Sequence, residues 1–275
     1  MSDRRVAIVT GASRGIGEAT AWRLAAAGWH VFATARDTAS LEGMASERVT
    51  PLRLDLNDDD SIQDCVNTVL TDAGRVDALV SNAGYSASGA LELFELEDVR
   101  RQFQTNVFGP LRMSQLVLPA MRAQGSGRIV HLGTVMGRVS FPLLGAYSSS
   151  KAALESLNDA LRLEARRFGV RVVMVIPGTV RTEFDQVALD TLAERMPDEG
   201  SPHRESLEKL EKMISDTSEK GIPPEAVAAK VQEALEARHP RSVYVLTPEA
   251  RLAMRVLARL PVAVRDPLMR MPLRL

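Results

Sequence analysis

The chain has 275 residues, of which 45% are hydrophobic and 25% are charged, and its formal net charge is −1. This composition excludes disordered, collagen and coiled-coil classes, and the near-zero charge supplies no basic field for nucleic acid. Cys65 is the single cysteine and the four histidines are scattered, so neither an internal disulfide nor a metal site is expected. The sequence has no export signal and no apolar run of about 18 residues. We therefore expect a soluble, cytoplasmic protein.

Short apolar runs alternate along the chain with segments of helical period, a pattern typical of a parallel sheet covered on both faces. The predicted strands span residues 6–10, 30–34, 49–54, 76–81, 128–132, 170–176 and 242–246. The predicted crossover helices span 16–27, 59–73, 98–124, 146–168 and 224–238. The sequence thus predicts one α/β domain over residues 1–275, with about seven strands and helices on both faces of the sheet.

Residues 183–221 interrupt this alternation, because they are polar and charged and contain no predicted strand. A segment this long inside a compact domain is usually a functional lid or a disordered linker. We interpret it as a lid over the substrate, built from helical pieces.

Residues 247–275 form a predicted helical extension. Thr247, Pro248 and Glu249 are typical of a helix start, Pro261 is expected to end the helix, and the tail beyond it is expected to be irregular. The helix carries arginines at every fourth position beside apolar residues, namely Arg251, Arg255 and Arg259 with Leu252, Val256, Leu257 and Leu260. Such a helix can lie on anionic lipid as a peripheral membrane contact. More commonly it packs on its own domain or on a sister subunit.

A glycine-rich turn follows the first predicted strand, in the order Thr10-Gly11-Ala12-Ser13-Arg14-Gly15-Ile16-Gly17. Glycines there let the backbone approach a pyrophosphate, whose charge is then favoured by the free N–H groups at the start of a helix. The alternative is a plain tight turn, but the strand-to-helix context favours a dinucleotide-binding loop.

The residue after the second strand bears on which nucleotide is bound. Ala35 stands where an acid would accept hydrogen bonds from a ribose 2′-OH, and Arg36 follows it. Together with Arg14 this places two cations near one ribose, which favours NADP(H) over NAD(H). In the alternative, both arginines are surface charges and Asp37 accepts from the ribose. The hydroxyl of Thr34 or Ser13 is expected to add contacts.

Two further turns lie at the predicted carboxyl edge of the sheet, where open α/β sheets bind ligands. Asp55 and Leu56 follow the third predicted strand. Asp55 is expected to accept a hydrogen bond from the adenine amino group. In the alternative, Asp55 caps the next helix together with Asn57–Asp60. Asn82-Ala83-Gly84 closes the fourth strand with a turn of small residues that exposes the backbone.

Tyr147 and Lys151 lie four residues apart at the start of a long predicted helix, so their side chains share one face. A phenol has an ordinary pKa near 10, and a neighbouring ammonium together with an oxidised nicotinamide favours the phenolate. This pair suits proton transfer near neutral pH. The alternative is an interface tyrosine and a surface lysine.

With these motifs in order, the sequence resembles the short-chain dehydrogenase/reductases over Val6 to about Thr182. Residues 31–36 and the C-terminal extension resemble, within this family, the hydroxysteroid and retinol dehydrogenases. The motifs are the glycine turn, Asn82-Ala83-Gly84, Asn106, Tyr147-x-x-x-Lys151, and Pro177-Gly178 followed by Val180 and Thr182. The resemblance implies a Rossmann-like fold and a homodimer or homotetramer. It makes Tyr147 the general acid or base and has Lys151 hold the cofactor ribose. Asn106 then positions a water, and Val180 and Thr182 hold the nicotinamide.

One residue departs from the family pattern. The family usually has a serine thirteen positions before the tyrosine, and this chain has Thr134 there. Threonine keeps the hydroxyl, but its added methyl group narrows the space beside the reacting carbonyl. The residues that the resemblance places around the substrate are mainly apolar, including Met136, Leu144 and Phe184, and they favour a lipophilic substrate. In the alternative they pack the core.

Two functions remain. The first is an NADP(H)-dependent oxidoreductase that moves a hydride between the nicotinamide and a carbonyl or alcohol. The second is a catalytically silent NADP(H)-binding sensor or scaffold, since a fold alone does not establish chemistry. A serine hydrolase is disfavoured because there is no G-x-S-x-G elbow, and Gly125-Ser126-Gly127 is too short to be one.

Overall fold

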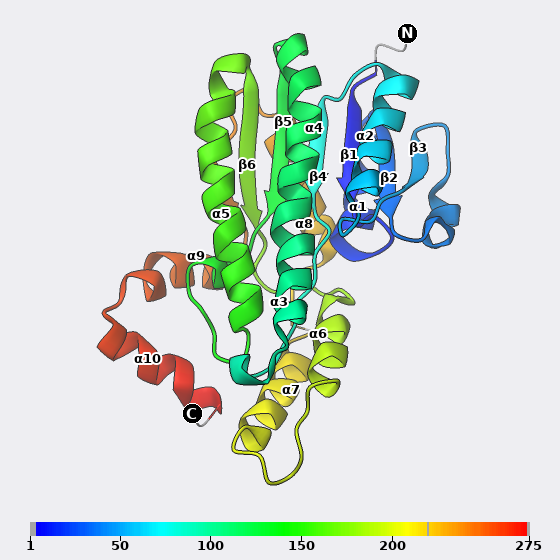
Figure 1. Cartoon of the computed structure of the whole chain (residues 1–275). Helices are drawn as coiled ribbons and strands as arrows, with labels where there is room; N and C mark the ends of the chain where they lie inside the picture. The colour runs from blue at the N-terminus through cyan, green and yellow to red at the C-terminus, as the bar shows by residue number, and fades with distance from the viewer. Residues whose placement is uncertain (1–3, 219, 274–275) are drawn as a thin grey trace.

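The computed structural model of the chain describes residues 4–218 and 220–273 (Figure 1). Seven parallel strands form one sheet in the order β3-β2-β1-β4-β5-β6-β7, so the predicted fold class is confirmed. The strands are β1 (Val6–Thr10), β2 (His30–Ala35), β3 (Val49–Arg53), β4 (Ala78–Ser81), β5 (Gly127–Leu132), β6 (Val170–Ile176) and β7 (Val243–Val245). Each lies within a residue or two of its predicted range.

The strands are buried on both faces because helices cover both faces of the sheet. One hydrophobic cluster joins the sheet to α1 (Gly15–Ala26) and α8 (Pro224–Glu236). A second joins the opposite face to α2 (Asp59–Ala73), α4 (Gly109–Gln124) and α5 (Gly145–Ala165), the three helices in front of the sheet in Figure 1. Alternate strand residues enter the two clusters, as the two-residue period of a strand requires.

The strand order reverses direction beside β1. The chain builds β1, β2 and β3 outward on one side, then returns to place β4 on the other side of β1. Such a switch point opens a crevice at the carboxyl ends of the strands, where doubly wound sheets bind ligands. The glycine turn between β1 and α1 lies at this point.

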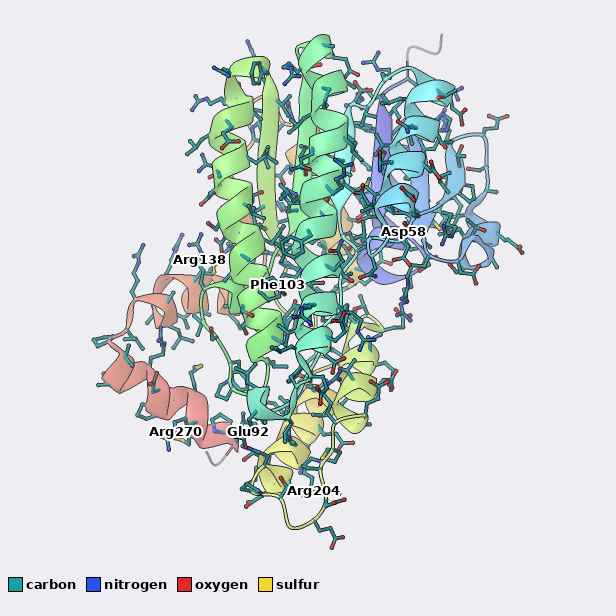
Figure 2. The ribbon with its side chains drawn as sticks, in the orientation of Figure 1. Asp58, Glu92, Phe103, Arg138, Arg204 and Arg270 are labelled. Atoms are coloured by element: carbon teal, nitrogen blue, oxygen red, sulfur yellow. The ribbon has the colours of Figure 1, made fainter. Side chains whose placement is uncertain are left out.

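The predicted helix 98–124 is not one regular α-helix. It consists of α3 (Leu96–Phe103), a π turn (Gln104–Phe108) and α4, and the π turn begins directly after Phe103, which is labelled in Figure 2. The helical period of the sequence continues through the junction. The buried side chain of Asn106 makes tertiary contacts there, and local propensity does not encode them. The sequence also did not predict the short 3₁₀ helix η1 (Thr38–Met44), which Asp37 caps.

The segment between β6 and α8 contains the expected helical pieces, α6 (Phe184–Ala193) and α7 (Arg204–Ser218), which lie beyond the carboxyl ends of the strands (Figure 1). Polar contacts fasten it to the body of the domain. Arg195 pairs with Asp98 at 2.9 Å, and the Thr191 hydroxyl donates to the Ser86 carbonyl at 3.1 Å.

After β7 the chain forms α9 (Pro248–Arg255), whose start is capped by the Thr247 side chain as predicted. The expected helix end at Pro261 is wrong, because the backbone leaves helical geometry at Val256, with φ −104° and ψ −65°. Arg259 therefore lies in the 3₁₀ helix η6 (Leu257–Arg259). The tail is not irregular either: Pro261, whose ring fixes φ at a helix-compatible value, precedes α10 (Val262–Arg270) and η7 (Met271–Leu273).

Candidate active site

The glycine turn after β1 is held tightly against the turn after β4. Gly11 and Gly15 have left-handed φ angles of 65° and 58°. A Cβ at Gly17 would lie 2.0 Å from the Gly11 carbonyl oxygen, and one at Gly11 would lie 2.9 Å from the Cα of Ala83. The Asn82 amide donates to the carbonyls of Thr10 and Gly11, both at 3.0 Å. Only glycine fits at Gly11 and Gly17, and Asn82 holds the turn in place.

The start of α1 has the properties of an anion site. Arg14 stands at the N-cap position and makes no side-chain hydrogen bond to the helix. The N–H groups of the first turn of a helix have no carbonyl partner within it and attract an anion. Three residues that are predicted to contact the cofactor lie here: Ser13 and Arg14 directly before the helix, and Ile16 in its first turn.

Two exposed arginines flank the carboxyl ends of β1 and β2. Within residues 4–218 and 220–273, neither Arg14 nor Arg36 has an ion-pair partner. Asp37 accepts a hydrogen bond from the Ala39 N–H at 3.0 Å as the cap of η1, and its alternative role as a ribose acceptor stays a prediction. The expectation for Thr34 is wrong, because its fully buried hydroxyl donates to the Val9 carbonyl at 3.2 Å.

Asp55 and Leu56 are engaged by the protein itself. Oδ1 of Asp55 accepts from the backbone N–H of Asn57 at 2.9 Å and from its side chain at 3.1 Å. The Leu56 side chain is buried in the core, and its carbonyl accepts from Gln104 at 3.0 Å. The neighbouring Asp58, labelled in Figure 2, caps α2 as expected. A cofactor contact at Asp55 and Leu56 stays a prediction.

Tyr147 and Lys151 meet at the carboxyl end of β5, on the first two turns of α5. Their exposed fractions are 8% and 7%, and the Lys151 ammonium lies 6.0 Å from the centroid of the Tyr147 ring. Lys151 donates to the carbonyl of Leu132 at 2.9 Å, and the Tyr147 hydroxyl has a side-chain hydrogen bond with Thr134. The structure thus brings together three of the four predicted catalytic side chains.

Burial sets the protonation of this group. It raises the pKa of Tyr147 well above the ordinary value of 10.0; the hydrogen bond with Thr134 opposes this, and the charge of Asp185 adds to it. Burial also lowers the pKa of the Lys151 ammonium to about 8. At neutral pH the chain without cofactor therefore has a neutral phenol beside an ammonium ion, which is the proton-donating state of the pair.

Asn106 joins the same cluster from the π turn. Its side-chain amide donates to the Tyr85 carbonyl at 3.0 Å and to the Ser150 hydroxyl at 3.1 Å, and its oxygen accepts from the Tyr85 N–H at 3.2 Å. A Cβ at Gly84 would lie 3.0 Å from Asn106 Oδ1 and 3.7 Å from Lys151 Nζ. Sequence reasoning missed Tyr85 and Ser150, although both directly adjoin predicted motifs.

The loop after β6 closes the other side of the glycine turn. A Cβ at Gly15 would lie 3.0 Å from Cγ2 of Thr182, so the two predicted cofactor-binding segments are in contact. Pro177 precedes Gly178, which has a φ of 86° and leaves no room for a side chain against Thr247. Val180 forms an isolated bridge with Ile222 at the end of the lid segment.

The lid helix α6 reaches the tyrosine. The Phe184 ring lies 5.9 Å from the Tyr147 ring, measured between centroids. Leu144 is buried and Met136 is partly buried in a cluster with three leucines of α6 and α7, namely Leu192, Leu207 and Leu210. In this structure these predicted substrate contacts therefore form the core between the lid and the loop before Tyr147.

Sequence reasoning also missed Asp185, the neighbour of Phe184. Its carboxyl is half-buried, and burial raises its pKa. Among the described residues it has no hydrogen-bond or ion-pair partner. Its position beside a predicted substrate residue was the available signal. The described residues contain no group of three or more His, Cys, Asp or Glu side chains suited to a metal ion.

The family model described as short chain dehydrogenase matches residues 5–192. The chain belongs to the short-chain dehydrogenase family. The predicted resemblance and the predicted oxidoreductase class are therefore confirmed. The matched range contains the glycine turn, Asn106, Tyr147, Lys151 and the loop after β6.

Two curated relatives of this short-chain dehydrogenase are reductases. An NADPH-dependent 3-dehydrocapnine reductase of Ornithobacterium rhinotracheale is 32% identical over 89% of each chain. A 3-ketodihydrosphingosine reductase of Bacteroides thetaiotaomicron is 35% identical over 76% of each chain.

Solved structures extend the likeness. A metagenomic short-chain oxidoreductase in complex with NADP has a TM-score of 0.69 and 28% identity, covering 88% of this chain and 97% of the other. A short-chain dehydrogenase/reductase of Burkholderia phymatum in complex with NAD has a TM-score of 0.81 and 26% identity over 92% of each chain. Both nicotinamide nucleotides thus occur among the neighbours.

Proposed function

We propose that this short-chain dehydrogenase uses NADP(H) to interconvert a lipophilic carbonyl compound and its alcohol, with Tyr147 as the general acid or base. The observation that carries the proposal is the buried group at the carboxyl end of β5, where Tyr147 is hydrogen-bonded to Thr134 and lies beside the Lys151 ammonium. A silent sensor or scaffold needs no such group, so the enzyme is favoured.

The residues around the crevice fit a dinucleotide phosphate. The backbone of Gly11, Gly15 and Gly17 would hold the pyrophosphate, because the turn admits no Cβ at Gly17 and leaves helix N–H groups free. Arg14 and Arg36 would hold a 2′-phosphate, which supports NADP(H) over NAD(H). Asp55 and Leu56 would border the adenine.

The remaining cofactor contacts lie nearer the reacting atoms. Two loops would enclose the nicotinamide end of the cofactor, and Lys151 would reach the ribose. The loops contribute Asn82, Ala83 and Gly84 after β4, and Pro177, Gly178, Val180 and Thr182 after β6. When bound, the nicotinamide supplies or accepts the hydride at the carbonyl carbon.

The chain's own residues handle the proton. In the reducing direction Tyr147, neutral because burial raises its pKa, donates its proton to the substrate oxygen, and Thr134 holds that oxygen by a hydrogen bond. The phenolate left behind is stabilised by the nearby Lys151 ammonium. The Asn106 side chain is occupied by Tyr85 and Ser150, so the Asn106 carbonyl in the π turn is the group that would hold a water for reprotonation.

The substrate is expected to be apolar near the tyrosine. The Phe184 ring packs beside Tyr147, and Met136 and Leu144 continue this apolar surface under the lid segment 183–221. The reductase names of the two curated relatives support reduction as the direction. We further expect a homodimer or homotetramer in the cytoplasm.

The test follows NADPH oxidation with a panel of apolar ketones and aldehydes, with NADH and the Tyr147→Phe variant in parallel. Turnover that weakens with NADH and disappears in the variant is the expected result. Full turnover in Tyr147→Phe would exclude the proposed role of Tyr147. Arg36→Ala is expected to weaken NADPH binding more than NADH binding, and equal affinities for NADPH in the variant and the wild type would exclude the 2′-phosphate contact.

A further inference from the structure

The C-terminal arm, residues 248–273, exposes an unusual amount of apolar surface. It comprises α9, η6, α10 and η7 and extends to one side of the domain (Figure 1). Of the twelve exposed large hydrophobic residues in the described part of the chain, six lie on this arm: Leu252, Val256, Val262, Val264, Leu268 and Met271. A concentration of exposed apolar side chains in one segment is typical of an interaction site.

Helix α9 is apolar on two opposite faces. Ala250 and Met254 are buried, and Met254 packs with Leu154, Met174 and Ile176 of the domain. Leu252 is 62% exposed, and Val256, which directly follows the helix, is 43% exposed. Two residues along a helix correspond to about 200° of rotation, so Leu252 points away from the face that Ala250 and Met254 bury. The outer apolar face is therefore not needed to hold α9 on the domain.

Helix α10 has no buried residue. Val264, Leu268 and Met271 follow one another at intervals of four and three, which places them on one face, and they are 50%, 44% and 70% exposed. Beyond them Leu273 is fully buried in the hydrophobic cluster of the lid. The arm is thus fixed at both ends, by Met254 and by Leu273, while the surface between them faces solvent.

The charge of the arm differs in sign from that of the whole chain. The arm contains five arginines and two carboxylates, Glu249 and Asp266, whereas the whole chain carries a net charge of −1. The arginines are Arg251, Arg255, Arg259, Arg265 and Arg270. Arg251 and Arg255 lie four residues apart, adjacent in sequence to the exposed Leu252 and Val256. Figure 2 shows Arg270 at the end of α10. Apolar side chains flanked by arginines match the composition of helices that lie on anionic membranes.

A second copy of the chain suits this surface less well. A two-fold dimer through the arm would place the same patch against itself and bring two sets of arginines together. An anionic bilayer accepts the apolar residues at its acyl boundary and the arginines at its headgroups. None of the helices described here is long and apolar enough to cross a bilayer, so the contact would be peripheral.

We propose that the C-terminal arm binds the surface of an anionic lipid bilayer, with Leu252, Val256, Val264, Leu268 and Met271 inserted and the arginines at the phosphate level. Because Leu273 packs with the lid, bilayer contact also positions the lid at the lipid surface. This binding depends on the arm alone and not on the proposed substrate.

Flotation of the full-length protein with vesicles tests the proposal. The protein is expected to float with vesicles of phosphatidylglycerol mixed with phosphatidylcholine, and to stay at the bottom with phosphatidylcholine alone. The double variant Leu252→Asp/Leu268→Asp is expected to lose flotation. Leu163→Asp, the same change at a residue 64% exposed on α5, is the matched control and should float like the wild type.

A second double variant, Arg255→Gln/Arg259→Gln, tests the electrostatic part. It should bind the anionic vesicles at least about tenfold more weakly, since each arginine near an anionic surface contributes measurably to binding. Circular dichroism verifies that all variants fold, which is expected because the changed residues are exposed.

Three results would overturn the proposal. The first is a wild-type protein that does not float with anionic vesicles. The second is a Leu252→Asp/Leu268→Asp variant that floats as well as the wild type. The third is a wild-type oligomer, measured by light scattering, that the same variant dissociates while vesicles have no effect. That third result would assign the surface to another copy of the chain.

Discussion

The buried Lys151 is expected to lower the stability of the fold, and Lys151→Met should reveal the cost. Lys151 is 7% exposed, and burial lowers the pKa of its ammonium group from 10.5 to about 8. Each pKa unit corresponds to about 1.4 kcal/mol, so holding this charge costs about 3 kcal/mol near neutral pH. Methionine has a similar length and no charge, but it leaves the Leu132 carbonyl without the 2.9 Å hydrogen bond, at a cost of about 1–3 kcal/mol. The variant is therefore expected to be as stable as the wild type at pH 7, or up to about 2 kcal/mol more stable.

The pH dependence gives the sharper test. Below pH 8 Lys151 is protonated in both the folded and the unfolded chain, and the cost is fully present. Between pH 8 and 10.5 the unfolded chain binds more protons than the folded one, so the stability of the wild type rises relative to that of the variant. The advantage of Lys151→Met should therefore shrink as the pH rises through this window.

Urea unfolding of the chain without cofactor, at several pH values from 7 to 10, measures both effects. Lys230→Met is the control, because Lys230 is paired with Glu233 at the surface and its replacement should change stability by less than about 1 kcal/mol. A Lys151→Met variant that is more than about 3 kcal/mol less stable than the wild type at pH 7 would refute the reasoning. A difference that does not change with pH would also refute it.

Three further substitutions test the site. Gly17→Ala should destabilise the chain by about 1–3 kcal/mol and weaken NADPH binding, because its Cβ would lie 2.0 Å from a backbone oxygen. Gly43→Ala is the control, since a Cβ there would meet nothing within 4 Å. Equal NADPH affinity of the two variants in a titration would contradict the role of the turn. Thr134→Ser should stay active and Thr134→Val should lose most of its kcat, whereas full activity of the valine variant would show that another group orients the substrate oxygen. Asp185→Asn removes a charge that raises the pKa of Tyr147, so the pH profile of alcohol oxidation should move to lower pH. Asp190→Asn on the same helix is the control. An unchanged profile in Asp185→Asn would show that Asp185 does not act on Tyr147.

The parts of the fold that were predictable are those in which local sequence and tertiary packing agree. Strands such as Val170–Ile176 are apolar at nearly every position because helices cover both faces of the sheet, and the apolar run alone reveals this. The glycine turn was predictable for a related reason, since a turn that admits no Cβ at Gly17 must have glycine there. The Tyr147 and Lys151 pair followed from helical spacing, which the structure keeps.

The rest depends on contacts that spacing does not contain. The π turn at Gln104–Phe108 accompanies the bonds of Asn106 to Tyr85 and Ser150, residues 21 and 44 positions away in sequence. The hydroxyl of Thr34 or of Ser13 was expected to add a cofactor contact, but a strand alternates its side chains, and the Thr34 hydroxyl is buried and donates to the Val9 carbonyl. The helix of the tail after Pro261 was missed because proline was taken as an end, although it serves equally well as a start.

Lys151 and Gly17 show why stability and activity need not change together in this site. At Gly17 the requirement is steric, so a substitution that disturbs the turn should reduce stability and cofactor binding together. At Lys151 the requirement is electrostatic: an exposed ammonium would be screened by water, and its effect on a phenolate at this distance would be small. Burial strengthens the interaction with Tyr147 and, for the same reason, raises the cost of the charge in the chain without cofactor. Of these two positions, Lys151 is therefore the one where substitution is expected to keep or raise stability while activity falls.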